Sequence, residues 1–101
     1  MSIIKVTNEN FKEVINSKHT VLIDFYADWC GPCRMLGPVL EEISNEKNDV
    51  VIGKINVDDS RELANQFGIR SIPTMIVFKN GSEVDRMIGF FKKEDILARL
   101  S

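Results

Sequence analysis

The chain has 101 residues, 44% of them hydrophobic and 28% charged, a balance typical of a globular protein, and we expect residues 1–101 to form a single domain. Thirteen basic and fifteen acidic residues leave a net charge of -2, which argues against nucleic-acid binding by phosphate neutralisation. The longest uninterrupted apolar run, residues 75–78, is too short to span a bilayer, so no membrane association is expected.

The amino-terminal residues and the cysteine content indicate the compartment and the chemistry of the protein. Residues 1–7 lack the apolar core of a secretion signal, which favours a cytoplasmic protein. The only cysteines are Cys30 and Cys33. Structural disulfides are rare in the reducing cytosol. The pair is therefore predicted to carry chemistry rather than to hold the fold together.

The first part of the chain predicts two strands separated by a helix. The strands are Ile3–Val6 and Thr20–Tyr26, the second rich in β-branched and aromatic residues and therefore buried. The helix would begin after a cap at Thr7 or Asn8. Its buried face comprises Phe11, Val14 and Ile15.

A long helix and a third strand follow. The helix begins at Pro32, and the strand is Val50–Val57. Apolar residues in the helix recur at the spacing of a single buried face. They are Leu36, Val39, Leu40 and Ile43.

The last part predicts a short helix, a hairpin and a final helix. Ser60 would cap the short helix, which ends at Gly68. The dipeptide at positions 80–81 is Asn-Gly, a strong signal for a type I′ turn, here between strands Thr74–Lys79 and Glu83–Ile88. The final helix begins at about Lys92. The apolar faces of the two helices comprise Leu63, Ala64 and Phe67, and Ile96, Leu97 and Leu100.

This order of elements predicts an α/β fold. The strand–helix–strand units require parallel strands with right-handed crossovers, whereas the hairpin adds antiparallel pairing. The five strands therefore form one mixed sheet, and the four helices pack on both of its faces.

The segment Trp29-Cys30-Gly31-Pro32-Cys33 lies where a buried strand passes into a helix. Pro32 suits the first helical position, so Cys30 lies at the helix start, facing free N–H groups and the positive end of the helix dipole. Both effects favour the thiolate and lower the pKa of Cys30. Cys33, one helical turn further on, is close enough to form a disulfide with it.

The pair has two other interpretations, a structural staple and a metal site. A structural staple would close a very small loop, worth roughly 2 kcal/mol or less in chain-entropy terms. A structural zinc site needs four ligands, whereas the chain adds only the distant His19 to its two cysteines. We expect no metal, and a redox-active dithiol is the preferred interpretation.

Three segments of the chain resemble the thioredoxin family. They are residues 24–33 (DFYADWCGPC), residues 68–74 (GIRSIPT) and residues 78–81 (FKNG). The resemblance covers essentially the whole chain, in the family's order and spacing, and implies the thioredoxin fold. It also implies protein-disulfide reduction, in which Cys30 attacks a substrate disulfide and Cys33 resolves the mixed disulfide.

The resemblance implies partners as well. In the family, an NADPH-dependent flavoprotein, thioredoxin reductase, reduces the disulfide again. The expected partners are this reductase and disulfide-containing proteins, with the chain itself a monomer. No nucleotide-binding fingerprint is present, and no cofactor is expected.

Asp24 is an acid inside an apolar strand. From the sequence alone it is either satisfied at a polar edge or by backbone groups, or buried with a raised pKa. The resemblance favours the second alternative, in which Asp24 exchanges a proton with Cys33. Lys54 resembles the family's lysine near that acid, although it could equally extend to solvent.

The resemblance also implies a substrate surface, formed by Trp29, Gly31, Pro32, Ile72, Pro73 and Gly89. Pro73 would follow a cis peptide bond and face the dithiol, although trans is the usual form. Gly89 could instead simply end a strand, and Trp29 could belong to the core. Asp58 matches a family acid near that tryptophan, or is a solvated loop acid.

The chain departs from the family pattern at three places. Tyr26 stands where a second tryptophan is common, Gly37 where alanine is usual, and Phe90-Phe91 where smaller residues are common. The last of these puts the range of partners in doubt. Two rival functions remain, a disulfide oxidase or isomerase and a non-catalytic binding module. The Gly31-Pro32 pair, which resembles the reducing members, and the missing signal peptide disfavour the oxidase or isomerase.

Overall fold

A computed structural model describes residues 3–101 as five strands and four helices. The elements in chain order are β1 (Ile4–Lys5), α1 (Phe11–Ile15), β2 (Thr20–Tyr26), α2 (Gly31–Glu46), β3 (Val50–Asn56), α3 (Arg61–Gln66), β4 (Thr74–Lys79), β5 (Ser82–Ile88) and α4 (Lys93–Leu100).

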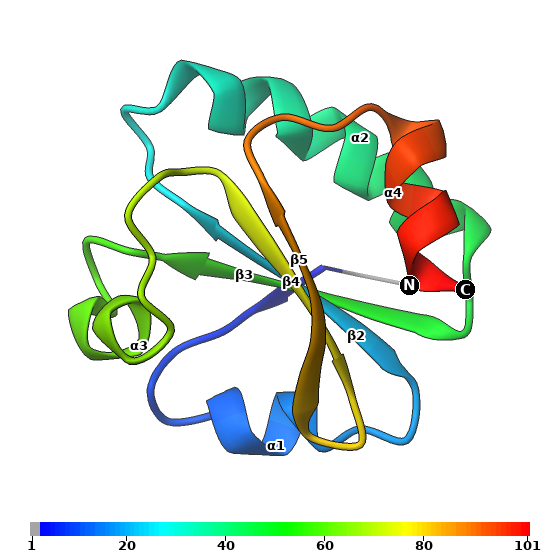
Figure 1. Cartoon of the computed structure of the whole chain (residues 1–101), viewed down its shortest axis with the longest axis horizontal. Coiled ribbons are helices and arrows are strands. Elements are labelled where there is room, and N and C mark those ends of the chain that lie inside the picture. The colour runs from blue at the N-terminus through cyan, green and yellow to red at the C-terminus, as the bar shows by residue number, and fades with distance from the viewer. Residues whose placement is uncertain (1–2) are drawn as a thin grey trace.

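The strands form one mixed sheet in the order β1-β3-β2-β4-β5. Strands β1, β3 and β2 run parallel, whereas β4 pairs antiparallel with β2, and β5 with β4. The predicted mixed α/β fold is confirmed. Figure 1 shows α2 and α4 on one side of the sheet and α1 and α3 on the other.

Strand β2 lies at the centre and contributes to both faces, because successive side chains of a strand point to opposite sides. Ile23 and Phe25 pack into the core beneath α1 and α3. Leu22 packs into the other core, beneath α2 and α4. All three side chains are fully buried. The carboxyl end of β2 leads through a short loop into α2, and this junction carries the cysteines.

The turn between β4 and β5 has the predicted conformation. Asn80 and Gly81 have φ angles of 55° and 80°, and a type I′ turn requires positive φ at both positions. Glycine meets this requirement without steric cost.

Several predicted boundaries shift by a few residues. The strand expected over Ile3–Val6 is confined to Ile4–Lys5. The cap of the first helix is Asn10 rather than the predicted Thr7 or Asn8. The Asn10 side chain makes no cap hydrogen bond and accepts from the Thr7 N–H instead. Helix α2 begins at Gly31, one residue before the predicted start. No helix within residues 3–101 is long and apolar enough to span a membrane.

Candidate active site

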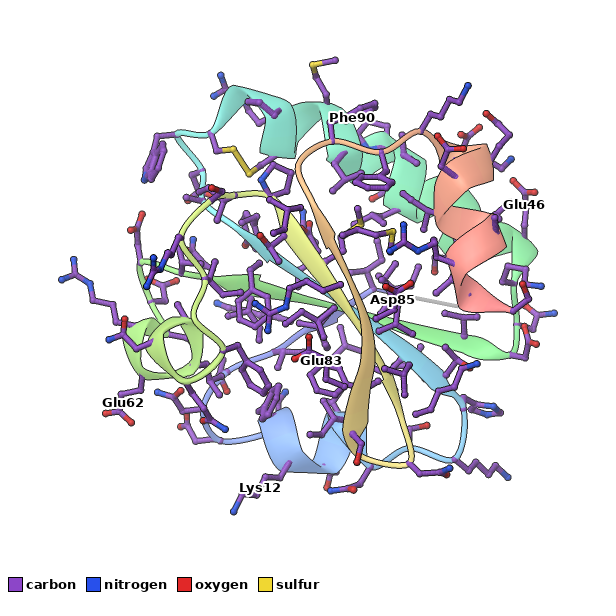
Figure 2. The ribbon with its side chains drawn as sticks, in the orientation of Figure 1. Lys12, Glu46, Glu62, Glu83, Asp85 and Phe90 are labelled. Carbon is purple, nitrogen blue, oxygen red and sulfur yellow. A yellow bond between two sulfur atoms is a disulfide. The ribbon has the colours of Figure 1, made fainter. Side chains whose placement is uncertain are left out.

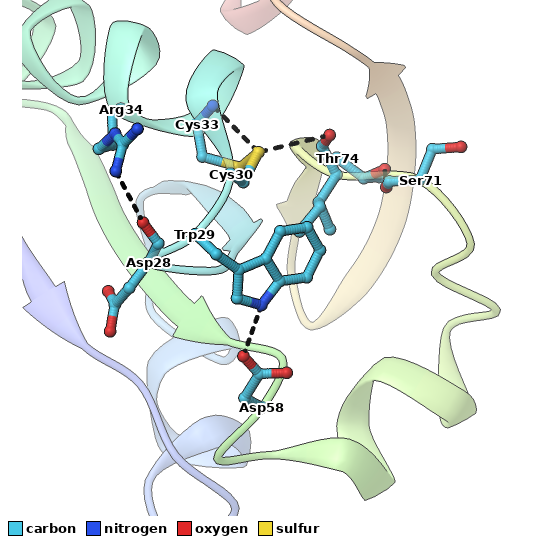
Figure 3. Close-up of a disulfide and its surroundings, with 9 residues drawn as sticks. Asp28, Trp29, Cys30, Cys33, Arg34, Asp58, Ser71 and Thr74 are labelled. Atoms are coloured by element: carbon cyan, nitrogen blue, oxygen red, sulfur yellow. Dashed lines mark hydrogen bonds between the residues drawn. A yellow bond between two sulfur atoms is a disulfide. The ribbon is translucent and has the colours of Figure 1, made fainter.

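Cys30 and Cys33 form a disulfide at the amino terminus of α2. Cys30 is the N-cap, with extended backbone, and the Cys33 N–H donates a hydrogen bond to its Sγ at 3.2 Å (Figure 3). Pro32 therefore occupies the second helical position, where its missing N–H also needs no intrahelical partner, rather than the first as predicted. The helix terminus therefore directs the Cys33 N–H toward the Cys30 sulfur.

The dithiol faces the segment that precedes β4. The Sγ of Cys30 lies 3.7 Å from the carbonyl oxygen of Ile72, and the Ile72–Pro73 peptide bond is cis, as the resemblance implied. Both cysteines are nearly buried, with 5% of Cys30 and 3% of Cys33 exposed. The two residues thus differ little in exposure, and Cys30 is the one beside Ile72.

Gly89 lies next to the same segment. Its N–H donates a hydrogen bond to the Pro73 carbonyl oxygen at 2.8 Å, and its φ angle is 95°, in the region that favours glycine. A Cβ at this position would have nothing within 4 Å. Gly89 therefore leaves open space beside Pro73.

Trp29 lies on the surface, with 68% of the residue exposed, so its alternative assignment to the core is wrong. Its Nε1 donates a hydrogen bond to Oδ2 of Asp58 at 2.9 Å (Figure 3). The interaction joins the loop before α2 to the loop after β3. Asp58 is exposed but engaged with the indole, which removes the alternative of an unengaged loop acid.

Asp24 is fully buried in the middle of β2. Among residues 3–101, neither of its carboxyl oxygens has a hydrogen-bond partner, so the alternative of a satisfied carboxylate is wrong. Burial raises the pKa of Asp24 from 3.8 to about 7, although the Lys54 ammonium partly opposes this by lowering it. An acid with this pKa exchanges protons near neutral pH.

Lys54 is the residue directly opposite Asp24 in the parallel β2–β3 register. It is half-buried, and its Nζ lies 4.4 Å from the centroid of the Tyr26 ring. Lys54 therefore extends along the sheet over an aromatic face rather than freely into solvent.

An open pocket of about 390 Å³ lies between the end of β2 and α2. It is lined by Tyr26, Ala27, Asp28, Cys33, Arg34, Gly37 and Lys54. The pocket brings Cys33 and Lys54 to one cavity. Within residues 3–101, no cluster of three or more His, Cys, Asp or Glu side chains is arranged to hold a metal ion.

Three further side chains had no site role predicted from the sequence, and of these Tyr26 packs against the cluster that contains both cysteines. Met35 is 64% exposed and Phe90 is 42% exposed, and Tyr26 contacts Lys54. Phe90 lies on the segment between β5 and α4, which passes beside α2 (Figure 2). Met35 falls outside the apolar stripe of α2, and that offset was the available sequence signal for its exposure.

Comparison with known proteins identifies the family. The thioredoxin family model matches residues 2–101. The chain belongs to the thioredoxin family. It is 54% identical over 95 residues to a thioredoxin of Chlamydia caviae, covering 94% of this chain and 91% of that protein. It is 48% identical to a thioredoxin of Pyropia yezoensis, covering 100% of this chain and 96% of that one.

Solved thioredoxin structures have the same fold. The structure of Malassezia sympodialis thioredoxin matches with a TM-score of 0.89 and 37% identity, covering 98% of this chain and 88% of that one. A mutant thioredoxin from Halobacterium salinarum matches with a TM-score of 0.92 and 35% identity, at the same coverages. This thioredoxin-family chain, with its Cys30–Cys33 pair, is a protein-disulfide oxidoreductase that acts by dithiol/disulfide exchange.

Proposed function

We propose that this thioredoxin works in the reducing direction, as a general dithiol electron donor to protein disulfides. The observation that carries the exchange chemistry is the position of Cys30, which caps α2 with its Sγ accepting the Cys33 N–H, and the reducing direction rests on the resemblance of Gly31-Pro32 to the reducing members of the family. In the reduced protein, the same N–H and the helix dipole stabilise a Cys30 thiolate. A thiolate at neutral pH is the form that attacks a disulfide.

In the first step, Cys30 is the nucleophile. Its thiolate attacks one sulfur of the substrate disulfide, which forms a mixed disulfide and releases the other substrate sulfur as a thiolate. Cys30 lies beside the Ile72 carbonyl, and the cis Pro73 follows directly. We assign backbone pairing with the substrate to Ile72, and contact with the substrate chain to Pro73 and Gly89.

In the second step, Cys33 resolves the mixed disulfide. Cys33 gives its proton to the Asp24 carboxylate and attacks the Cys30 sulfur, which expels the second substrate thiolate. Two electrons pass to the substrate, and the Cys30–Cys33 disulfide forms. The pKa of Asp24, about 7, suits a group that must accept a proton near neutral pH. Lys54 is assigned a supporting role at this acid.

The exposed surface around the dithiol is assigned to docking. Trp29 presents a large apolar surface held by Asp58, and Gly31 and Pro32 lie between the two cysteines. A backbone without large side chains at Gly31 allows a substrate chain to approach the sulfurs. Asp58 acts here as a support for Trp29.

The proposal extends to partners and place. A flavoprotein reductase that uses NADPH returns the two electrons, and the chain acts as a monomer and as a single domain over residues 1–101. The cytoplasm is the proposed compartment, because a reducing pool keeps such a dithiol ready to donate electrons. Family membership supports the reductase and the disulfide proteins as partners.

A coupled assay tests the direction of electron flow. The chain is mixed with NADPH, a thioredoxin reductase and a protein containing a disulfide, and NADPH consumption is followed. We expect turnover that depends on the chain. No turnover with any reductase, or faster oxidation of dithiol substrates than reduction of disulfides, would contradict the proposal.

Two serine variants test the division of labour between the cysteines. Cys30→Ser should abolish reduction, because no nucleophile remains. Cys33→Ser should attack but not resolve, which leaves substrate covalently bound at Cys30 and visible by mass spectrometry. Adducts on Cys33 in the Cys30→Ser variant, with none in the other, would reverse the roles. A double variant that keeps full cellular function would instead indicate a non-catalytic binding module.

A further inference from the structure

Asp24, Tyr26 and Lys54 project from the same side of the sheet. Asp24 and Tyr26 are two residues apart on β2, so their side chains point to the same face. Lys54 is the β3 residue opposite Asp24 in the parallel register. Its ammonium could therefore turn either toward the acid or toward the ring.

The ammonium lies over the ring. Its Nζ is 4.4 Å from the Tyr26 centroid, within the range of a cation–π interaction. The carboxyl oxygens of Asp24 make no ion pair or hydrogen bond within residues 3–101, so Lys54 lies near the acid without contacting it. The contact that holds the lysine head group is with the aromatic face.

We propose that Tyr26 is a positioning residue, whose ring holds the Lys54 ammonium close enough to Asp24 to act on the carboxyl group by charge, but out of contact with it. The inference rests on the proposed role of Asp24 as proton acceptor for Cys33. A contact ion pair would lock the acid as a carboxylate, whereas an ammonium free in solvent would lose its influence through screening. The Tyr26 ring keeps the Lys54 ammonium out of a contact ion pair with Asp24 and also out of bulk solvent.

Other charged and titratable groups also face this region. Asp28, Arg34 and Cys33 line the same pocket as Tyr26 and Lys54, and Glu41 of α2 lines a neighbouring pocket with Lys54. The Tyr26 hydroxyl hydrogen-bonds the Asn56 side chain, while burial and the nearby Asp28 raise the pKa of Tyr26, so the phenol stays neutral. The ring, rather than the hydroxyl, contacts the ammonium.

Separate substitutions test this positioning role by removing the Tyr26 ring, the Tyr26 hydroxyl or the Lys54 charge. Tyr26→Leu removes the ring, and Tyr26→Thr is a second ringless variant with a residue suited to a strand. Tyr26→Phe keeps the ring and removes only the hydroxyl. Lys54→Met removes the charge with little change in length. Each is measured in the full chain in its oxidised form, alone and, for Tyr26→Leu, combined with Lys54→Met.

The readout is the titration of the Asp24 carboxyl carbon followed by NMR. Lys54→Met should raise the pKa of Asp24 by about 1 pH unit, as expected for losing a nearby opposite charge. Tyr26→Leu and Tyr26→Thr should raise it in the same direction, because the released ammonium moves to water. Tyr26→Phe should leave it unchanged. Adding Tyr26→Leu to Lys54→Met should produce no further rise.

The outcomes separate this inference from the proposed function. A Tyr26→Leu effect that persists in the Lys54→Met background, or a fall in the Asp24 pKa, would overturn the positioning role. The pH profile of disulfide reduction should shift to higher pH in Tyr26→Leu and not in Tyr26→Phe. Full activity of Asp24→Asn would overturn the role of Asp24 itself, whatever the titrations show.

Discussion

The two faces of the central sheet differ in what they bury. Beneath α1 and α3, the side chains of Ile23 and Phe25 join a core cluster of hydrophobic residues. On the other face, under α2, the same strand buries the carboxyl group of Asp24, with no hydrogen-bond partner among residues 3–101. The side chains on both faces come from the same strand, and neighbouring residues of that strand point to opposite faces. Strand propensity and sheet topology therefore do not explain why β2 buries a carboxyl group on one face and apolar side chains on the other.

The difference indicates where the fold gives up stability for chemistry. An unpartnered buried acid is costly, and the cost is lower on this face because Lys54 lies nearby and the acid can stay protonated. This face also carries the helix that presents Cys33. The face under α1 and α3 buries apolar side chains, whereas the face under α2 buries an acid whose pKa is raised to about 7.

The largest effect is expected from placing an acid on the apolar face. Ile23→Asp should lower the free energy of unfolding at pH 7 by about 4–5 kcal/mol, from lost packing and an unpaired buried acid. The loss should shrink at low pH, where the new acid is neutral. Denaturant titrations at pH 4 and pH 7 measure this loss of unfolding free energy. Ile23→Val is the control and should cost about 1 kcal/mol. A loss below that of the control would mean that both faces tolerate acids equally.

Removing the natural acid, Asp24, should have the opposite effect on the free energy of unfolding. The folded pKa of Asp24, about 7, lies above the unfolded value of 3.8, so the folded state binds more protons between these values. Stability therefore falls as pH rises from about 4 to 7, by roughly 4 kcal/mol in all. Asp24→Asn should lack this fall and be more stable than the parent at pH 8.

The same variant should reduce disulfides more slowly, because Cys33 loses its proton acceptor. Paired urea titrations across pH 4–8 and reduction kinetics check both expectations. An Asp24→Asn protein whose stability follows the pH dependence of the parent would show that another group titrates in this range.

A smaller effect is expected in the aromatic cluster of the apolar face. The ring of Phe67 packs edge-on against Phe11 and Phe78, with centroids 5.4 Å and 5.7 Å away. Phe67→Leu should cost about 1–2 kcal/mol, because it removes two edge-to-face contacts along with some buried area. Thermal unfolding measures it. Phe90→Leu, on the exposed segment before α4, is the control and should change stability by less than about 0.5 kcal/mol.

The smallest effect is expected from Gly37 on α2. A Cβ there would have nothing within 4 Å, so Gly37→Ala should stabilise the protein by about 0.5–1 kcal/mol through helix propensity. Gly53→Ala is the matched control on β3, where the Cβ would lie 2.6 Å from a methyl group of Val6 and should destabilise. Equal effects at the two positions would show that packing, not propensity, governs Gly37.

The sequence determined the order and type of the elements, because each rests on local signals. A run of β-branched and aromatic residues marked β2, periodic apolar residues marked α2, and the Asn-Gly pair marked the turn. The spacing of Cys30 and Cys33, together with Pro32 at the junction of a strand and a helix, predicted a redox pair at a helix start. Element ends moved by a few residues, because caps depend on hydrogen bonds to neighbouring segments, as Asn10 illustrates.

Only the tertiary structure decided which alternatives hold around the dithiol. The cis bond before Pro73, the exposure of Trp29 and its hydrogen bond to Asp58 all depend on segments that are distant in the chain. The same is true of Asp24, whose raised pKa requires burial, and of Lys54, which strand pairing brings opposite the acid. Desolvation and Coulomb interactions depend on distance in space, and local sequence patterns do not contain that distance.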